Sequence, residues 1–126
     1  MGSPTLTLLL DSNIIIDALN GLEQGSRELL SDADAAISII AWIEVLAGYR
    51  GAVDDARARE LLQTLTVAEL SPAVVEETVN IRRTTPLNLP DAIILATARV
   101  HGLTLSTRNT RDFDANDPSV RIPYEL

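Results

Sequence analysis

Four acidic residues stand where the surrounding sequence is apolar or where a strand is expected to end: Asp11, Glu44, Asp91 and Asp112. Carboxylates gathered in one pocket repel one another, and this repulsion raises their pKa values unless a cation lies between them. Ligand sets made only of oxygen atoms select hard ions such as Mg²⁺ or Mn²⁺ over zinc. Such an ion lowers the pKa of a bound water and neutralises charge on a phosphoryl group, which is the chemistry of phosphodiester hydrolysis.

The sequence context of each acid favours a shared pocket. Asp11 directly follows the apolar run TLTLLL, and Glu44 is the only charged residue in the run ISIIAWIEVLAGY. Asp91 lies in the first turn of an expected helix, on the face that carries its apolar residues. Asp112 follows a short strand-like segment. These positions point the carboxylates toward the protein interior or toward the end of a sheet.

Each acid also has a purely structural explanation. Asp11 can cap the helix that follows it, Asp91 can interact with the dipole of its own helix, and Asp112 can form a turn. An acid within an apolar helix can mark a narrow exposed stripe. Asp114 and Asp117 lie close to Asp112 in the sequence, so the identity of the fourth acid stays open among these three.

The missing residue types exclude several reaction classes. The sequence has no cysteine and no lysine, and its single histidine is His101. Without cysteine there is no thiolate metal site, and without lysine there is no Walker A phosphate loop or Schiff base. A haloacid-dehalogenase-like phosphatase or a phosphate-accepting receiver also needs a lysine. The phosphatase further needs a second aspartate where this chain has Asn13.

The charge balance is acidic, with 18 acidic and 10 basic residues and a net charge of −8. This balance argues against nucleic acid as a partner, because phosphates are bound through basic side chains. All the basic residues are arginine, which binds phosphate bidentately, and a bound cation would reverse the local sign of an acidic site. The arginines that could form a basic, substrate-binding rim are Arg50, Arg82, Arg83, Arg108 and Arg111. The alternative is that they pair with surface acids.

The elements that must position these residues follow from the hydrophobic pattern. Continuous apolar strands are expected at 5–10, 35–39, 66–70 and 103–106, with an edge strand at 120–122. A helix capped by Ser12 or Asn13 follows the first strand, and further helices are expected at 24–30, 40–49, 53–65, 72–83 and 90–101. Alternating strands and helices predict an α/β fold, a sheet covered on both faces, with its ligand crevice at the carboxyl ends of the strands.

The length of 126 residues predicts a single domain, and the aromatic content of 3% predicts an aliphatic core. Residues Met1–Pro4 are typical of a cloning remnant or a frayed start. The apolar runs are far shorter than the roughly 20 residues that span a bilayer, so no membrane partner is expected. The absence of cysteine fits a cytoplasmic protein.

Four motifs, LLLDSNIIID, ISIIAWIEVLAG, LNLPDAIILATA and LSTRNTRDF, together resemble the PIN-domain family, and within it the VapC-type toxins of bacterial and archaeal toxin–antitoxin pairs. The resemblance extends from about Leu6 to Phe113. It implies a three-layer, Rossmann-like α/β/α fold with a central, mainly parallel sheet. It also implies an Mg²⁺- or Mn²⁺-dependent endoribonuclease, a homodimer, and a cognate antitoxin whose C-terminal segment blocks the site.

The resemblance identifies the four acids as the catalytic and metal-binding residues. Asn13 and Thr107 match the small polar positions that support the metal or the attacking water, and Arg108 and Asn109 lie in the segment beside the site. Water is then the nucleophile, so the products should carry 5′-phosphate and 3′-hydroxyl ends. The alternative function is a catalytically silent PIN-like module that acts through a protein partner. The RNA, the antitoxin and the number of metal ions stay open.

Overall fold

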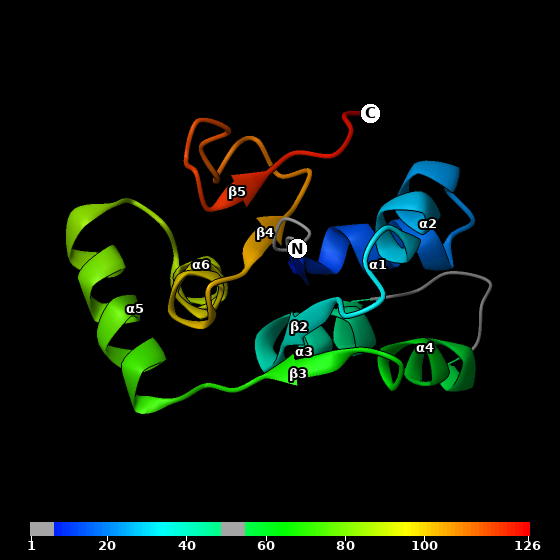
Figure 1. The fold of residues 1–126 in the computed structure, drawn as a ribbon, viewed down its shortest axis with the longest axis horizontal. Coiled ribbons are helices and arrows are strands. Elements are labelled where there is room, and N and C mark those ends of the chain that lie inside the picture. The colour runs from blue at the N-terminus through cyan, green and yellow to red at the C-terminus, as the bar shows by residue number, and fades with distance from the viewer. Residues whose placement is uncertain (1–6, 49–54) are drawn as a thin grey trace, which may run out of the picture.

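The computed structural model describes residues 7–48 and 55–126. Within these residues, five short strands form one parallel sheet in the order β3-β2-β1-β4-β5 (Figure 1). The strands are β1 (Leu8–Leu10), β2 (Ala36–Ser38), β3 (Thr66–Ala68), β4 (Thr104–Ser106) and β5 (Val120–Arg121). Leu9 of β1 lies opposite Ala36 of β2 and Leu105 of β4. The predicted α/β fold with a mainly parallel sheet and an edge strand near the C-terminus is confirmed.

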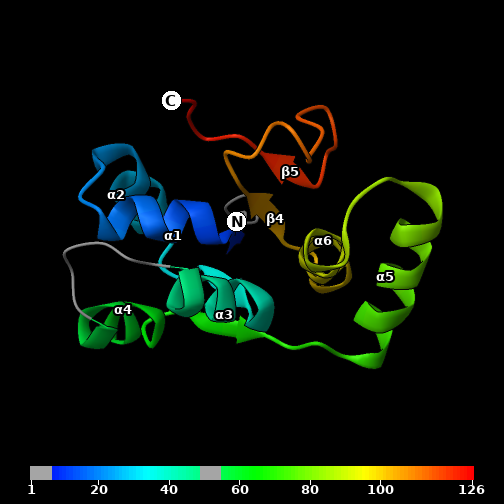
Figure 2. The same ribbon diagram turned by 180° about the vertical axis from the view of Figure 1, so that it is seen from behind.

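Six helices connect or flank the strands in the part of the chain that the structure describes. They are α1 (Ser12–Leu19), α2 (Glu23–Leu30), α3 (Ile39–Gly48), α4 (Asp55–Leu62), α5 (Pro72–Thr84) and α6 (Leu89–His101). From both sides of the molecule, α1 with α2 and α5 with α6 lie on opposite sides of β4 (Figures 1 and 2). All three residues of β1 are buried, as expected for a strand covered on both faces.

The first helix starts differently from the prediction. Its N-cap is Asp11, whose side chain accepts a hydrogen bond from the backbone N–H of Ser12. Ser12 and Asn13 therefore both lie inside α1. The prediction that one of them is the cap is wrong, and the alternative that Asp11 caps the helix is confirmed. The carboxylate already lies at the end of β1, so it meets the free N–H groups of the first turn before a later side chain can.

The two C-terminal helices have the expected boundary signals. Ser71 caps α5, with Pro72 in its first turn, as predicted. Helix α6 begins one residue before Pro90, because the Asn88 side chain caps it by accepting a hydrogen bond from the N–H of Asp91. Gly102 ends α6 with a φ of 68°, a left-handed conformation that glycine adopts without strain.

Several predictions from the sequence fall on residues outside the described ranges. They concern Met1–Pro4, Arg50, the start of the first predicted strand at residues 5 and 6, the end of the third predicted helix at residue 49, and the start of the fourth at residues 53 and 54. Within the described ranges, every predicted strand and helix is present, although each strand is one or two residues shorter than predicted.

The core is aliphatic, as the composition predicts. Apart from Thr97, its largest fully buried side chains are Leu, Ile and Val residues from β1, α1, β2, α3, α4, α5, α6 and β4. Phe113 is the aromatic residue that joins this buried cluster, at 2% exposure. Among the described residues, no helix has the length and hydropathy needed to cross a membrane.

Candidate active site

The site begins at the carboxyl end of β1, where Asp11 is only 4% exposed. Its Oδ1 accepts a hydrogen bond from the N–H of Ser12 at 2.8 Å. Its Oδ2 accepts bonds from the Thr107 hydroxyl at 2.8 Å and from the Asn13 side-chain amide at 3.3 Å. Burial raises the pKa of Asp11, and these hydrogen bonds lower it in part. The carboxylate is thus held in one orientation at the edge of the sheet.

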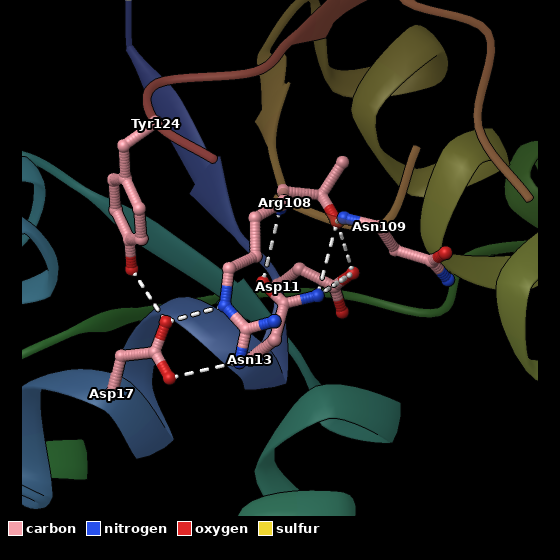
Figure 3. A network of polar contacts seen from close by, with 7 residues as sticks. Asp11, Asn13, Asp17, Arg108, Asn109 and Tyr124 are labelled. Carbon is pink, nitrogen blue, oxygen red and sulfur yellow. Dashed lines mark hydrogen bonds and ion pairs between the residues drawn. The ribbon is translucent and has the colours of Figure 1, made fainter. Parts of the chain in front are cut away.

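Thr107 and Asn13 join the carboxyl ends of two neighbouring strands. Thr107 directly follows β4, and its Oγ1 lies 3.2 Å from the Asn13 amide nitrogen and 3.1 Å from the backbone nitrogen of Asn109, both of which donate to it. The Asn13 side-chain oxygen accepts a hydrogen bond from the backbone N–H of Arg108 at 3.2 Å. The polar residues predicted to support the site therefore lie around Asp11 (Figure 3).

Asp91 lies in the first turn of α6 and is electrostatically coupled to the other three acids. Burial and the charges of Asp11, Asp112 and Glu44 raise the pKa of Asp91 from 3.8 to about 6. Carboxylates interact in this way only when they lie near one another. Asp91 therefore lies within electrostatic range of Asp11, Glu44 and Asp112, which are far from it in the sequence.

Glu44 projects from α3 and is half-buried. Burial and the charge of Asp11 raise its pKa, and the Ser12 side chain lowers it in part. Of its two sequence neighbours, Ile43 is exposed and Val45 is buried. Glu44 thus sits at the border between core and solvent, where a charged side chain can still face a cleft.

The three candidates for the fourth acid have different surroundings. Asp112 lies close enough to Asp91 to raise its pKa. Asp117 instead accepts hydrogen bonds from Arg99 at 2.6 Å and from the backbone of Ser119 at 2.8 Å. Asp114 accepts a bond from the backbone of its own turn. Of the three, Asp112 is the one coupled to the acidic group.

The chemistry of the donor set fits a hard divalent cation. Within the described residues, none of the ion pairs involves any of the four acids, so their mutual repulsion is not offset by an arginine there. In the same part of the chain, no three acidic or histidine side chains are already close enough to enclose an ion. Mg²⁺ suits such a loose group, because it binds directly to one or two carboxylates and keeps several of its waters.

The predicted arginine rim is only partly available to a substrate. The Arg108 guanidinium binds Asp17 through Nε at 2.6 Å and Nη2 at 2.9 Å (Figure 3). Arg82 donates to the backbone carbonyl of Leu87 at 2.7 Å, although its side chain is exposed. Arg83 and Arg111 are exposed to solvent. Their contact with RNA stays a prediction, as does that of Arg108.

The sequence alone did not reveal two buried acids, Asp17 and Glu28, which bind Arg108 and Arg121. Asp17 is 7% exposed and binds both Arg108 and the Tyr124 hydroxyl. A second buried acid, Glu28, binds Ser106 and Arg121. For Asp17 a signal existed, because it lies one helical turn after Asn13 within an otherwise apolar segment.

Comparison with known proteins gives a family and several structural relatives. The family model of the PIN domain matches residues 8–117. A chain of a toxin–antitoxin complex from Klebsiella pneumoniae is 41% identical, with a TM-score of 0.86, and the match covers 95% of this chain and 99% of that chain. FitAcB from Neisseria gonorrhoeae is 25% identical, with a TM-score of 0.71 and coverages of 95% and 100%.

A third relative, DNA-bound VapBC from Salmonella typhimurium, is also 25% identical, with a TM-score of 0.73 and coverages of 94% and 97%. The comparison with curated proteins gave no match. The family match and the high coverage of both chains extend over all the elements that carry the acidic residues.

Proposed function

Because the chain belongs to the PIN-domain family, we propose that it is a metal-dependent endoribonuclease and the toxin of a VapBC-type toxin–antitoxin pair. The observation that carries the proposal is the coupling of Asp91 to Asp11, Glu44 and Asp112, which together with burial raises the pKa of Asp91 to about 6. A purely structural acid at a helix start needs no such neighbours, because the helix dipole alone stabilises its charge. A cation-binding acid does need them.

The residues that would hold Mg²⁺ or Mn²⁺ are Asp11 and Asp91, with Glu44 and Asp112 completing the shell or orienting water. When bound, the cation supplies an activated water and neutralises charge on the phosphoryl oxygens. Asp11 is preorganised for this role because its hydrogen bonds fix both carboxylate oxygens. Asp91 must lose its proton to act as a ligand, so its raised pKa limits binding in mildly acidic solution.

The substrate class proposed for this site is RNA, bound mainly through its backbone. Few aromatic side chains are present, so stacking on bases contributes little. Exposed arginines provide positive charge on an otherwise acidic chain. Arg82 and Arg83 lie at the C-terminal end of α5, and Arg111 lies in the loop after β4. Water as the nucleophile predicts products with 5′-phosphate and 3′-hydroxyl ends.

An antitoxin partner and a homodimer belong to the same proposal. The Klebsiella pneumoniae relative is part of a toxin–antitoxin complex and covers nearly the whole chain. The second candidate function is a catalytically silent module that acts only through its partner. The presence of all four acids, coupled to one another, favours the enzyme.

Cleavage of total RNA by the purified protein in Mg²⁺ or Mn²⁺, with mapping of the cut ends, tests the proposal. We expect Asp11→Asn and Asp91→Asn to reduce the cleavage rate by about 100-fold or more, because each removes an anionic ligand of the cation that neutralises charge on the phosphoryl group. Asp114→Asn is the matched control, since Asp114 is an exposed acid outside the group, and it should cleave at the wild-type rate.

Two outcomes would contradict the enzyme. One is an Asp11→Asn protein that cleaves as fast as the wild type. The other is a folded wild-type protein that neither cleaves RNA nor binds Mn²⁺ at millimolar concentration, which would support the silent module instead. Circular dichroism of every variant ensures that loss of cleavage is not loss of fold.

A further inference from the structure

Helix α1 holds Arg108 at two points that lie one helical turn apart. The Asn13 side chain accepts a hydrogen bond from the Arg108 backbone N–H at 3.2 Å. The Asp17 carboxylate binds the guanidinium of the same residue through both Nε and Nη2 (Figure 3). Because Arg108 directly follows Thr107, these contacts fasten the segment after β4 to the side of α1.

The Asp17 carboxylate is buried, and both of its oxygens accept hydrogen bonds. Asp17 is 7% exposed, and its Oδ2 also accepts a hydrogen bond from the Tyr124 hydroxyl at 2.8 Å. A planar guanidinium on a carboxylate gives two parallel bonds of defined direction, which a longer or monodentate contact does not. The pairing therefore holds Arg108 in one position, and Tyr124 links the C-terminal tail to the same carboxylate.

The fastened segment carries groups that contact two of the proposed metal ligands. The Thr107 hydroxyl donates to Asp11 Oδ2 at 2.8 Å, and the Asn109 side-chain amide donates to Asp112 Oδ2 at 3.0 Å. The backbone N–H of Asn109 in turn donates to Thr107 Oγ1. A shift of this segment away from α1 would move both contacts together.

We infer that Asp17 is a positioning residue of the site: by binding Arg108, it keeps Thr107 and Asn109 in place beside Asp11 and Asp112. The expected effect of Asp17 on catalysis rests on the proposed function, whereas its role in positioning Thr107 and Asn109 does not. It also assigns the Arg108 guanidinium a structural partner in place of an RNA phosphate.

The geometric part is tested by nuclear magnetic resonance of the metal-free protein. In Asp17→Asn, which keeps the side-chain volume and removes the charge, we expect the signals of the Asn13 side-chain amide and the Asn109 backbone N–H to shift or broaden. The matched control is Asp55→Asn, which breaks an exposed Asp–Arg pair of the same 2.6 Å length in α4 and should leave those signals unchanged.

The functional part is tested by Mn²⁺ titration and by steady-state cleavage of RNA in a double-mutant cycle. Asp17→Asn and Arg108→Gln should each weaken Mn²⁺ binding and lower kcat by about tenfold or more, as is usual when the support of a metal ligand is removed. The double variant should lose no more than the worse single variant, because both changes break one contact. Asp17→Glu should recover part of the loss.

Direct binding of RNA by Arg108 predicts a different pattern. Arg108→Gln would then raise KM with kcat and Mn²⁺ affinity unchanged, and Asp17→Asn would leave KM unchanged or lower it by freeing the guanidinium. That result, or unchanged amide signals in Asp17→Asn, overturns the inference. A wild-type protein that fails to cleave RNA overturns the proposed function instead, while the metal-free spectra still decide the role of Asp17.

Discussion

Among the four acids of the site, Asp91 is the residue whose pKa is raised to about 6. Burial, followed by the charges of three other carboxylates, raises this pKa, although the position of Asp91 in the first turn of α6 favours the charged form. The favourable effect of the helix dipole on a charged Asp91 is therefore outweighed by burial and by the charges of Asp11, Glu44 and Asp112. An acid with a raised pKa in the folded state makes folding more favourable when it is protonated.

The stability of the cation-free protein should consequently depend on Asp91. Between pH 4 and pH 6 the folded state binds more protons than the unfolded state, so stability falls as the pH rises through this window. We expect Asp91→Asn to raise the free energy of unfolding at pH 7 in EDTA by about 1 kcal/mol and to flatten this pH dependence. Urea unfolding at several pH values measures both effects, with Asp114→Asn as control. A destabilised Asp91→Asn protein would contradict the repulsion between the acids.

The elements bring the supporting residues together by close packing, as the contact between α1 and α2 shows. Gly25 of α2 is buried against α1, and a Cβ atom at this position would lie 2.8 Å from the backbone nitrogen of Ala18 and 2.9 Å from Cβ of Asp17. Only a glycine allows this approach, and the approach buries Asp17 beside Arg108. The packing of two helices thus determines where a charged side chain of the site lies.

Replacement of Gly25 tests this dependence. Helix propensity alone predicts that Gly25→Ala stabilises α2 by about 1 kcal/mol. We expect the opposite, a loss of about 1–3 kcal/mol in the free energy of unfolding, because the backbone of α1 must move to admit the methyl group. Gly48→Ala is the control, since among the described residues no heavy atom outside its own helix backbone and chain neighbours would lie within 4 Å of its Cβ, and it should be neutral or stabilising. Equal effects of the two substitutions in urea unfolding would argue against close packing here.

The whole molecule carries a net charge of −8, and part of this charge is concentrated in one acidic group. The folded state therefore gathers carboxylates that the unfolded chain keeps apart. A cation that binds only the folded group stabilises the protein by mass action, and the gain is about 2.7 kcal/mol at 100 times its Kd. The ion that supports cleavage should therefore also raise the free energy of unfolding.

Thermal unfolding with and without Mn²⁺ measures this linkage. We expect millimolar Mn²⁺ to raise the Tm of the wild type by several degrees. In a domain of this size, each kcal/mol of stabilisation raises the Tm by roughly 4 °C. Asp11→Asn should lose most of this increase, whereas Asp114→Asn should retain it, because Asp114 lies outside the coupled acids. An increase of equal size in all three proteins would indicate non-specific binding to the acidic surface.

Residue types and their local order were sufficient to predict the strands, the helices and most of their boundaries. Apolar runs, Pro72, Gly102 and the caps act over a few residues, so their effects can be recognised without knowing the remote parts of the chain. Sequence context and the resemblance to PIN domains singled out the four acids, and their role as metal ligands stays a prediction. The helix start at Asp11 was misplaced because the preference for a capping residue cannot distinguish it from Ser12 and Asn13 next to it.

Contacts between remote segments depended on tertiary structure alone. Asp112 joins the acidic group and Asp117 does not, because Arg99, 18 residues away in the sequence, binds Asp117. Arg108 binds Asp17, 91 residues earlier in the chain, and Tyr124 of the C-terminal tail binds the same carboxylate. Pairing of charges is determined by which groups meet in the folded chain, and a linear pattern of charges does not contain that information.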